Sequence, residues 1–196
     1  MHWVLAITDR VLTWGLVGVG VGMFLESAYL PLPSEVILPF AGYLVAHGRA
    51  TFVEAVVVAL VGSLFGGWAG YELARYGGRP LLERWGRYVG LRPHELDRAE
   101  RWFRRHGDGA VLLGRLLPGV RTYISLPAGV AAMPRGRFLL FSALGALPWT
   151  VLFTYVGWIV GQSSGTLSHL SHLFAAAAGV AAVGWLVYLW RHRRAR

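Results

Sequence analysis

The most constraining feature of the chain is an apolar run that is long enough to cross a membrane. Residues 138–161 are 24 consecutive positions without a charged side chain, and a helix of that length spans the ~30 Å hydrocarbon core of a bilayer. Further apolar runs cover residues 11–25, 52–74 and 170–190. Because 55% of residues are hydrophobic and the mean hydropathy is +0.48, we expect an all-α polytopic membrane protein. It would form a single membrane domain over residues 1–196, with about four membrane-spanning helices.

Two other apolar stretches are interrupted by prolines and charges. Residues 26–50 carry two glutamates and three prolines, and residues 109–134 carry two arginines together with prolines. Irregular backbone at membrane depth is tolerated only where it is buried in protein or lines a watery cavity. We therefore expect both stretches to be re-entrant hairpins rather than simple spans.

The arginines orient this arrangement. Cytoplasmic segments of membrane proteins carry an excess of basic residues, and the rule is satisfied here when residues 79–107 and both chain termini are cytoplasmic. The first hairpin then enters from outside and the second from inside, as in an inverted-topology repeat. The N-terminal apolar stretch contains Asp9 and Arg10 and lacks a small-residue cleavage site, so we expect it to be retained.

The segment between the two expected hairpins predicts helices at the cytoplasmic surface. Residues 93–106 combine an apolar stripe with arginines on the other side, which is typical of an amphipathic helix lying on a membrane. The net charge of +9 therefore indicates an anionic membrane surface rather than nucleic acid. The chain has no cysteine, so thiolate metal sites are excluded, and we expect neither a metal nor a cofactor.

Glycines recur every four residues along the apolar run at residues 52–74. The positions are Gly62, Gly66 and Gly70. Small residues at this spacing let two membrane helices approach closely. The pattern predicts a close helix–helix contact along this face.

Apart from Arg49 near the end of the first, four charged side chains fall within the expected hairpins. They are Glu26 and Glu35 in the first, and Arg115 and Arg121 in the second. An arginine at bilayer depth costs about 2.5–3.5 kcal/mol on insertion scales, so we expect the hairpin tips to meet in a charge-compensated cluster. Two interpretations remain open: a static ion-pair lock, or a site in which arginines bind a phosphate and carboxylates hold a cation or proton.

Two neighbours of the arginines add hydrogen-bond donors to the expected site. Pro118 and Gly119 interrupt the helix and expose backbone N–H groups at the start of the next half-helix, which favours an anion. Thr122 adds a hydroxyl group. We therefore expect Arg115, Arg121, Thr122 and Gly119 to bind the substrate.

These residues lie in motifs that resemble the DedA family of bacterial membrane proteins, whose shared module is also called the VTT or SNARE-associated domain. The first hairpin has the family's pattern of two acidic residues around a Pro-rich turn, here "ESAYLPLPSE" at residues 26–35. The second has "GRLLPGVRTYISLPAGVAAMPRGRF" at residues 114–138, with Leu116 where the family often has Phe. The resemblance covers roughly residues 15–162.

The resemblance implies a multi-pass protein of the bacterial cytoplasmic (inner) membrane that translocates a lipid phosphate. The sequences of the motifs are most similar to the branch of the family that recycles undecaprenyl phosphate. Several family members behave as if their activity is coupled to protons. Arg115 and Arg121 would then hold the phosphate, while Glu26 and Glu35 would exchange protons.

Three alternatives to an undecaprenyl phosphate flippase stay open. The first is a flippase or scramblase for phospholipids such as phosphatidylethanolamine, and the second is a structural membrane factor without transport. The third, a lipid phosphatase, lacks an evident nucleophile–base pair in the sequence, so we expect the protein not to be an enzyme. The sequence leaves open the transport direction, the coupling ion and a homo-oligomeric state.

Overall fold

The fold was analysed in a computed structural model that describes residues 14–30, 32–85, 97, 101–103, 105–117 and 120–162, except for the side chains of residues 79–85. All regular secondary structure in these residues is helical, which confirms the predicted all-α class for this part of the chain. In chain order the helices are α2 (Leu16–Ser27), α3 (Ser34–Ala46), α4 (Phe52–Trp85), α6 (Gly109–Leu116), α7 (Ser125–Val130) and α8 (Arg135–Gln162).

Two of these helices are long and apolar enough to cross a membrane. They are Phe52–Gly78 within α4, with 27 residues, and α8, with 28 residues. The helix α4 runs past the predicted end of its span at residue 74 and continues to Trp85. Its backbone is non-helical at Gly78, where φ is 60°, a conformation that glycine adopts without steric cost. The predicted span at residues 170–190 lies outside the described residues, as do most of residues 93–106.

The first predicted helix does not end where the sequence suggested. No proline or glycine follows Leu25 before Pro31, so α2 extends past Leu25 to Ser27, and α3 begins at Ser34 after a turn. The two helices pack against each other and have 12 and 13 residues. At 1.5 Å per residue, each is about 18–20 Å long, which is less than the thickness of the hydrocarbon core. Residues 26–50 therefore contribute the turn and second arm of a helical pair that begins at Leu16.

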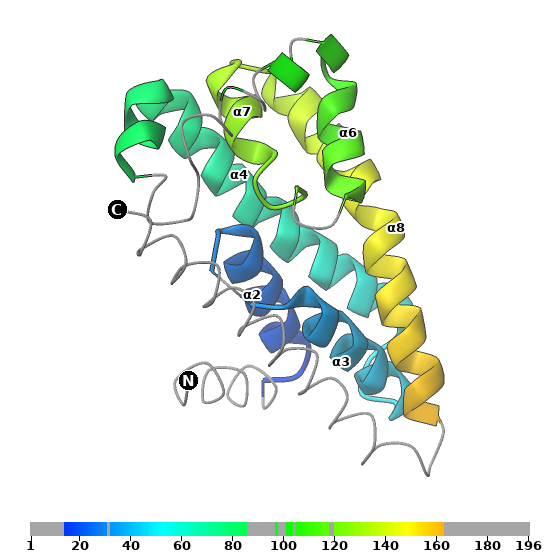
Figure 1. Cartoon of the computed structure of the whole chain (residues 1–196). Helices are drawn as coiled ribbons and strands as arrows, with labels where there is room; N and C mark the ends of the chain where they lie inside the picture. Colours follow the sequence, from blue (N-terminus) through cyan, green and yellow to red (C-terminus); the bar gives the residue numbers. More distant parts are fainter. Residues whose placement is uncertain are drawn as a thin grey trace, which may run out of the picture.

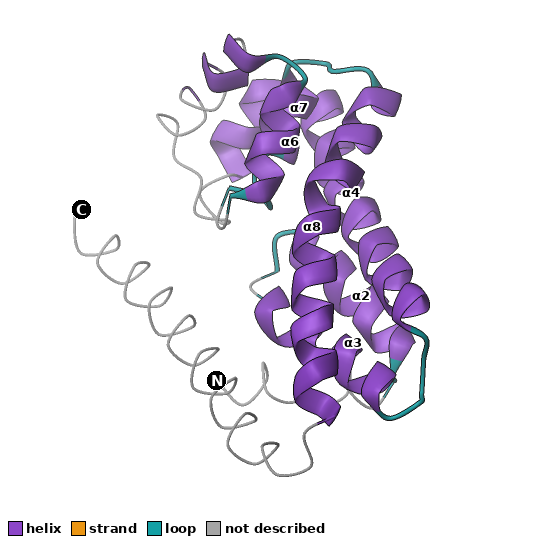
Figure 2. Cartoon of the chain, turned by 90° about the vertical axis from the view of Figure 1, so that its right-hand side faces the viewer, coloured by secondary structure: helices purple, strands orange, loops and turns teal. Residues whose placement is uncertain are grey.

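The packing of the first three described helices is repeated by the last three. Helix α2 packs on α4 and α3 packs on α8, whereas α6 packs on α8 and α7 packs on α4. The long helices α4 and α8 also contact each other. The contacts of α2, α3 and α4 thus correspond to those of α6, α7 and α8 in the same order, as expected for two related halves. Figures 1 and 2 show the α2–α3 pair and the α6–α7 pair at opposite ends of the two long helices.

The glycine face of α4 makes the predicted close contact. A methyl group at Gly62 would overlap the backbone oxygen of Gly20 in α2, and one at Gly66 would overlap that of Phe24. Only glycine lets the two backbones approach this closely. One turn further along, Gly70 lies against the ring of Tyr29. The prediction of a close helix contact is confirmed, and the partner is the first helical pair.

Candidate functional site

The turns of the two helical pairs meet beside α4. Tyr29 in the first turn stacks on Tyr123 in the second, with ring centroids 5.8 Å apart. Arg121 in the second turn donates a hydrogen bond from Nη2 to Oε1 of Glu26, over 3.0 Å, although 95 positions separate them in the sequence. The expected meeting of these two segments therefore does occur in the structure.

Arg121 is surrounded by groups that compensate its charge. Besides Glu26, its Nη2 lies 3.7 Å from Oε1 of Glu35 and donates to Oγ of Ser34. Its guanidinium carbon lies 5.2 Å from the centre of the Trp149 ring, a distance that permits a cation–π interaction. The side chain is 12% exposed. Arg121 is thus a nearly buried cation whose counter-charges come from the first helical pair.

Glu26 is the centre of this cluster. Its Oε1 accepts hydrogen bonds from Arg121 and from Oγ1 of Thr122, the latter over 3.3 Å. Its Oε2 accepts one from Oγ of Ser27 over 3.1 Å, and Ser27 in turn bonds to Ser63 of α4 over 2.9 Å. Three donors therefore converge on a buried side chain that has no donor of its own when ionised.

Arg115, in the last turn of α6, has a different environment. It is 3% exposed, and its Nη2 donates to Oγ of Ser125 over 3.2 Å. Within the described part of the chain, its Nε has no hydrogen-bond partner and no carboxylate lies at ion-pairing distance. A buried arginine without a counter-ion is costly for the folded protein. The same group is therefore suited to bind an anionic ligand, because charge-assisted hydrogen bonds to phosphate are strong.

Glycines of the two long helices make room for Arg115. A methyl group at Gly67 of α4 would overlap its Nη2, and one at Gly145 of α8 would lie 2.6 Å from its Cβ. The side chain therefore lies between glycine surfaces of α4 and α8. This confinement fixes the guanidinium in position, which favours a binding site over a mobile surface charge.

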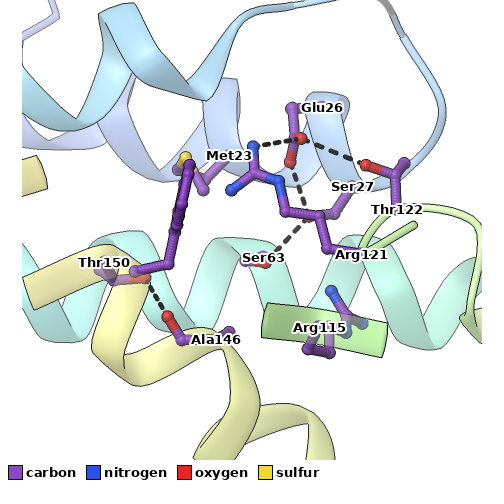
Figure 3. A pocket seen from close by; sticks show the side chains of 10 residues that line it. Met23, Glu26, Ser27, Ser63, Arg115, Arg121, Thr122, Ala146 and Thr150 are labelled. Atoms are coloured by element: carbon purple, nitrogen blue, oxygen red, sulfur yellow. Dashed lines mark hydrogen bonds and ion pairs between the residues drawn. The ribbon is translucent and has the colours of Figure 1, made fainter. Parts of the chain in front are cut away.

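The two arginines share one small pocket (Figure 3). Figure 3 shows Arg121 reaching Glu26, with Arg115 lying across the pocket from them. The free volume for the centre of a water molecule is about 10 Å³, which is space for roughly one water. A phosphate group is larger than this space. The lining residues are Met23, Glu26, Ser27, Ser63, Arg115, Arg121, Thr122, Ala146, Trp149 and Thr150.

The structure brings most of the predicted site residues together. Glu26, Arg121 and Thr122 form one hydrogen-bonded cluster, and Arg115 lines the same pocket. Glu35 lies at the edge of the cluster with a side chain that is 47% exposed. Gly119 is outside the described residues, so its expected role stays a prediction.

Several polar residues of the site were not predicted. They include Ser27 and Ser63 beside Glu26, Ser34 at Arg121 and Ser125 at Arg115. Serines are common in membrane helices as packing residues, so their position in an apolar run carries no signal of its own. Ser27, Ser34 and Ser125 do lie within the two motifs quoted above, whereas Ser63 lies outside them.

Comparison with known proteins adds a family and named relatives. Residues 32–159 match the VTT domain family. Undecaprenyl phosphate transporter A of Bacillus subtilis (strain 168) is 32% identical over 182 residues, which are 91% of this chain and 90% of that protein. The membrane protein YkoX of the same organism is 36% identical over 174 residues, 88% of this chain and 79% of that protein.

A third relative carries a different kind of name. The alkaline phosphatase-like protein of Lactococcus lactis subsp. cremoris (strain MG1363) is 31% identical over 176 residues, 85% of this chain and 82% of that protein. No solved structure matches the chain significantly. The relatives' names thus include both a transporter and a phosphatase-like protein.

Proposed function

The chain belongs to the VTT domain (DedA) family of helical membrane proteins, and on this premise we propose that it translocates an anionic lipid phosphate across a bacterial membrane. The observation that carries the proposal is Arg115, a buried cation that lines the pocket and has no carboxylate at ion-pairing distance among the described residues. The name of one relative, undecaprenyl phosphate transporter A, supports undecaprenyl phosphate as the lipid. The protein acts as a flippase rather than as an enzyme.

The mechanism exchanges one anion for another at Arg121. The phosphate first binds Arg115, whose Nε has no hydrogen-bond partner in the described part of the chain. It then displaces Glu26 from Arg121, while Thr122 and the backbone of Gly119 donate further hydrogen bonds. Glu26, separated from its cation, then exchanges a proton, and Glu35 at the edge of the charged cluster is the second exchanging group. Release of the phosphate restores the ion pair and frees the proton.

The same proposal assigns a topology. Helices α4 and α8 cross the inner membrane, and the pairs α2–α3 and α6–α7 enter it from opposite sides as re-entrant hairpins. The short arms and the repeated packing pattern support this arrangement. Residues 170–190 supply another span, and the arginine distribution places residues 79–107 and the C-terminus in the cytoplasm. The whole chain is then one membrane domain.

Transport in sealed proteoliposomes tests the proposal. A fluorescent polyprenyl phosphate and a fluorescent phosphatidylethanolamine are compared, with and without a pH gradient, for the wild type and for Arg121→Ala. The matched control is Arg137→Ala, because Arg137 is 67% exposed and lies outside the pocket. We expect the wild type and the control to move the polyprenyl phosphate faster when a pH gradient is present, and Arg121→Ala to move neither lipid.

The other outcomes identify the rival functions. Equal movement of both lipids would favour a phospholipid scramblase. Release of inorganic phosphate from the lipid would favour a phosphatase, which the name of the Lactococcus relative suggests for that protein. No movement of either lipid by folded protein would overturn transport and favour a structural role.

A further inference from the structure

Among the described residues, Arg115 has no carboxylate at ion-pairing distance and bonds to a hydroxyl group instead. Its Nη2 donates to Oγ of Ser125, and Tyr29 lies against the same glycine surface of α4. The hydroxyl oxygen of Tyr29 is buried and has no hydrogen-bond partner in the described part of the chain. Buried hydroxyl groups are nearly always paired. Two unpaired polar atoms, this hydroxyl and Nε of Arg115, therefore lie in one small region.

The three side chains lie on one glycine surface of α4. Gly67 contacts the guanidinium of Arg115 and Oγ of Ser125, and Gly70, one turn further, contacts the ring and hydroxyl of Tyr29. Residues three apart share a face of a helix. A methyl group at either glycine would overlap the side chain above it. The surface is thus shaped to hold these polar groups together.

The backbone of Tyr29 is strained in the conformation that places its ring there. Its φ is 72°, in the left-handed region that is sterically unfavourable for a bulky residue. Glycine or asparagine would adopt this turn more easily. Strained backbone of this kind concentrates at functional sites. The result of the strain is a ring stacked on Tyr123 and a hydroxyl group on the glycine surface near Arg115.

We propose that Tyr29 and Ser125 are further substrate-binding residues, which with Arg115 form a second half of the headgroup site. This inference rests on the proposed transport function and names its substrate class, a phosphate monoester. A monoester has three terminal oxygens and up to two negative charges, whereas a diester has two such oxygens and one charge. Arg115, Ser125 and Tyr29 bind one side of the phosphate, and Arg121 and Thr122 bind the other. Five side chains that donate hydrogen bonds suit the monoester.

The test removes single hydroxyl groups. Tyr29→Phe keeps the ring that stacks on Tyr123, and Ser125→Ala keeps the size of the side chain. In proteoliposomes we expect each change to raise the half-saturating concentration of a polyprenyl monophosphate about tenfold, with little change in the maximal rate. Movement of a phosphodiester lipid stays at its wild-type level. The matched control is Tyr155→Phe, a 46% exposed tyrosine of α8 whose ring packs on Phe52 and Trp158 rather than beside Arg115.

A binding measurement separates this inference from the transport proposal. The probe is a water-soluble, short-chain isoprenyl monophosphate, added to purified protein in detergent and followed by the shift in unfolding temperature. We expect the wild type and Tyr155→Phe to bind it, and Tyr29→Phe and Ser125→Ala to bind it about tenfold more weakly. Equal binding and equal half-saturation in all four proteins would overturn the inference and leave transport intact. Weakened binding in the variants without transport by the wild type would overturn the transport proposal alone.

Discussion

Arg121 and Arg115 are separated by six positions in the sequence and occupy the same pocket, yet their surroundings differ. Arg121 has the carboxylates of Glu26 and Glu35 at 3.0 and 3.7 Å. Arg115 is more deeply buried and has the hydroxyl group of Ser125 instead. The protein supplies a counter-charge to the first arginine and leaves the second without one among the described residues.

This difference bears on the choice between an ion-pair lock and a ligand site. A lock gains nothing from a buried arginine without a carboxylate, because such a charge is costly in a low-dielectric interior. A site for an anion benefits from it, since the ligand meets a cation that does not first have to leave a partner. In the proposed ligand site, Arg121 exchanges its carboxylate partner for the phosphate, and Arg115 binds the phosphate first.

The largest effect that we expect is the loss of stability in Arg121→Gln. The substitution leaves Glu26 buried without its cation, and breaking a buried ion pair in this way costs about 3–5 kcal/mol. We expect the thermal unfolding midpoint in detergent to fall well below that of the wild type. Arg137→Gln, at an exposed ion pair, serves as the control and should leave the midpoint nearly unchanged.

Exchanging the charges of Glu26 and Arg121 tests whether the contact needs only opposite charges. The double variant Glu26→Arg, Arg121→Glu restores opposite charges at the contact, so we expect it to recover part of the lost stability. It should not recover transport, because the cation would then project from α2 instead of the second turn. Full recovery of both stability and transport would contradict the distinction between Arg115 and Arg121. It would mean that the charges serve only to hold the two helical pairs together.

The second effect is the loss of transport in Arg115→Gln without a loss of stability. The substitution removes a charge that has no counter-ion among the described residues, so it leaves no carboxylate unpaired. Charge-assisted hydrogen bonds contribute about 1.5–3 kcal/mol, and their loss should slow polyprenyl phosphate transport by roughly 10- to 150-fold. The unfolding midpoint should equal or exceed that of the wild type. A variant that is strongly destabilised but still transports would contradict a ligand-binding role.

The sequence predicted that the charged residues of the two pairs meet, but it did not predict which of them pair with each other. The charged residues and prolines inside apolar runs predicted that Glu26, Glu35, Arg115 and Arg121 would meet, since each needs a partner at membrane depth. The pairing within the cluster was not predictable. It depends on which glycines face the arginines and on where the serines lie, and single small residues in an apolar run carry no directional signal.

The limits of the sequence also show in the first helical pair. Residues 11–25 read as a separate helix because their apolar run has no breaker before Pro31. In the structure α2 covers Leu16–Ser27, which places Glu26 inside a helix. Helix length and tertiary packing, rather than local pattern, decide that α2 and α3 form one pair.

The third effect comes from the glycine surface under Arg115. Gly67→Ala places a methyl group where Nη2 of Arg115 lies, so the guanidinium has to move. Overpacking of this kind typically costs about 1–3 kcal/mol of folding stability, so we expect a moderate fall in the unfolding midpoint together with a loss of transport. Gly136→Ala is the matched control, because a methyl group there meets nothing within 4 Å. Normal transport by Gly67→Ala would show that the position of Arg115 is not critical.

The smallest effect is expected at an exposed ion pair. This pair tests whether burial is the reason that Arg115 and Arg121 matter more for stability or transport than the other described arginines. Nη1 of Arg137 lies 2.9 Å from Oδ2 of Asp108, with side chains that are 67% and 29% exposed. Exposed pairs contribute about 0–1 kcal/mol, so Asp108→Asn should change neither transport nor the unfolding midpoint measurably. A loss as large as that of Arg121→Gln would mean that ion pairs stabilise this protein regardless of burial. The contrast between Arg115 and Arg121 would then no longer distinguish a ligand site from a lock.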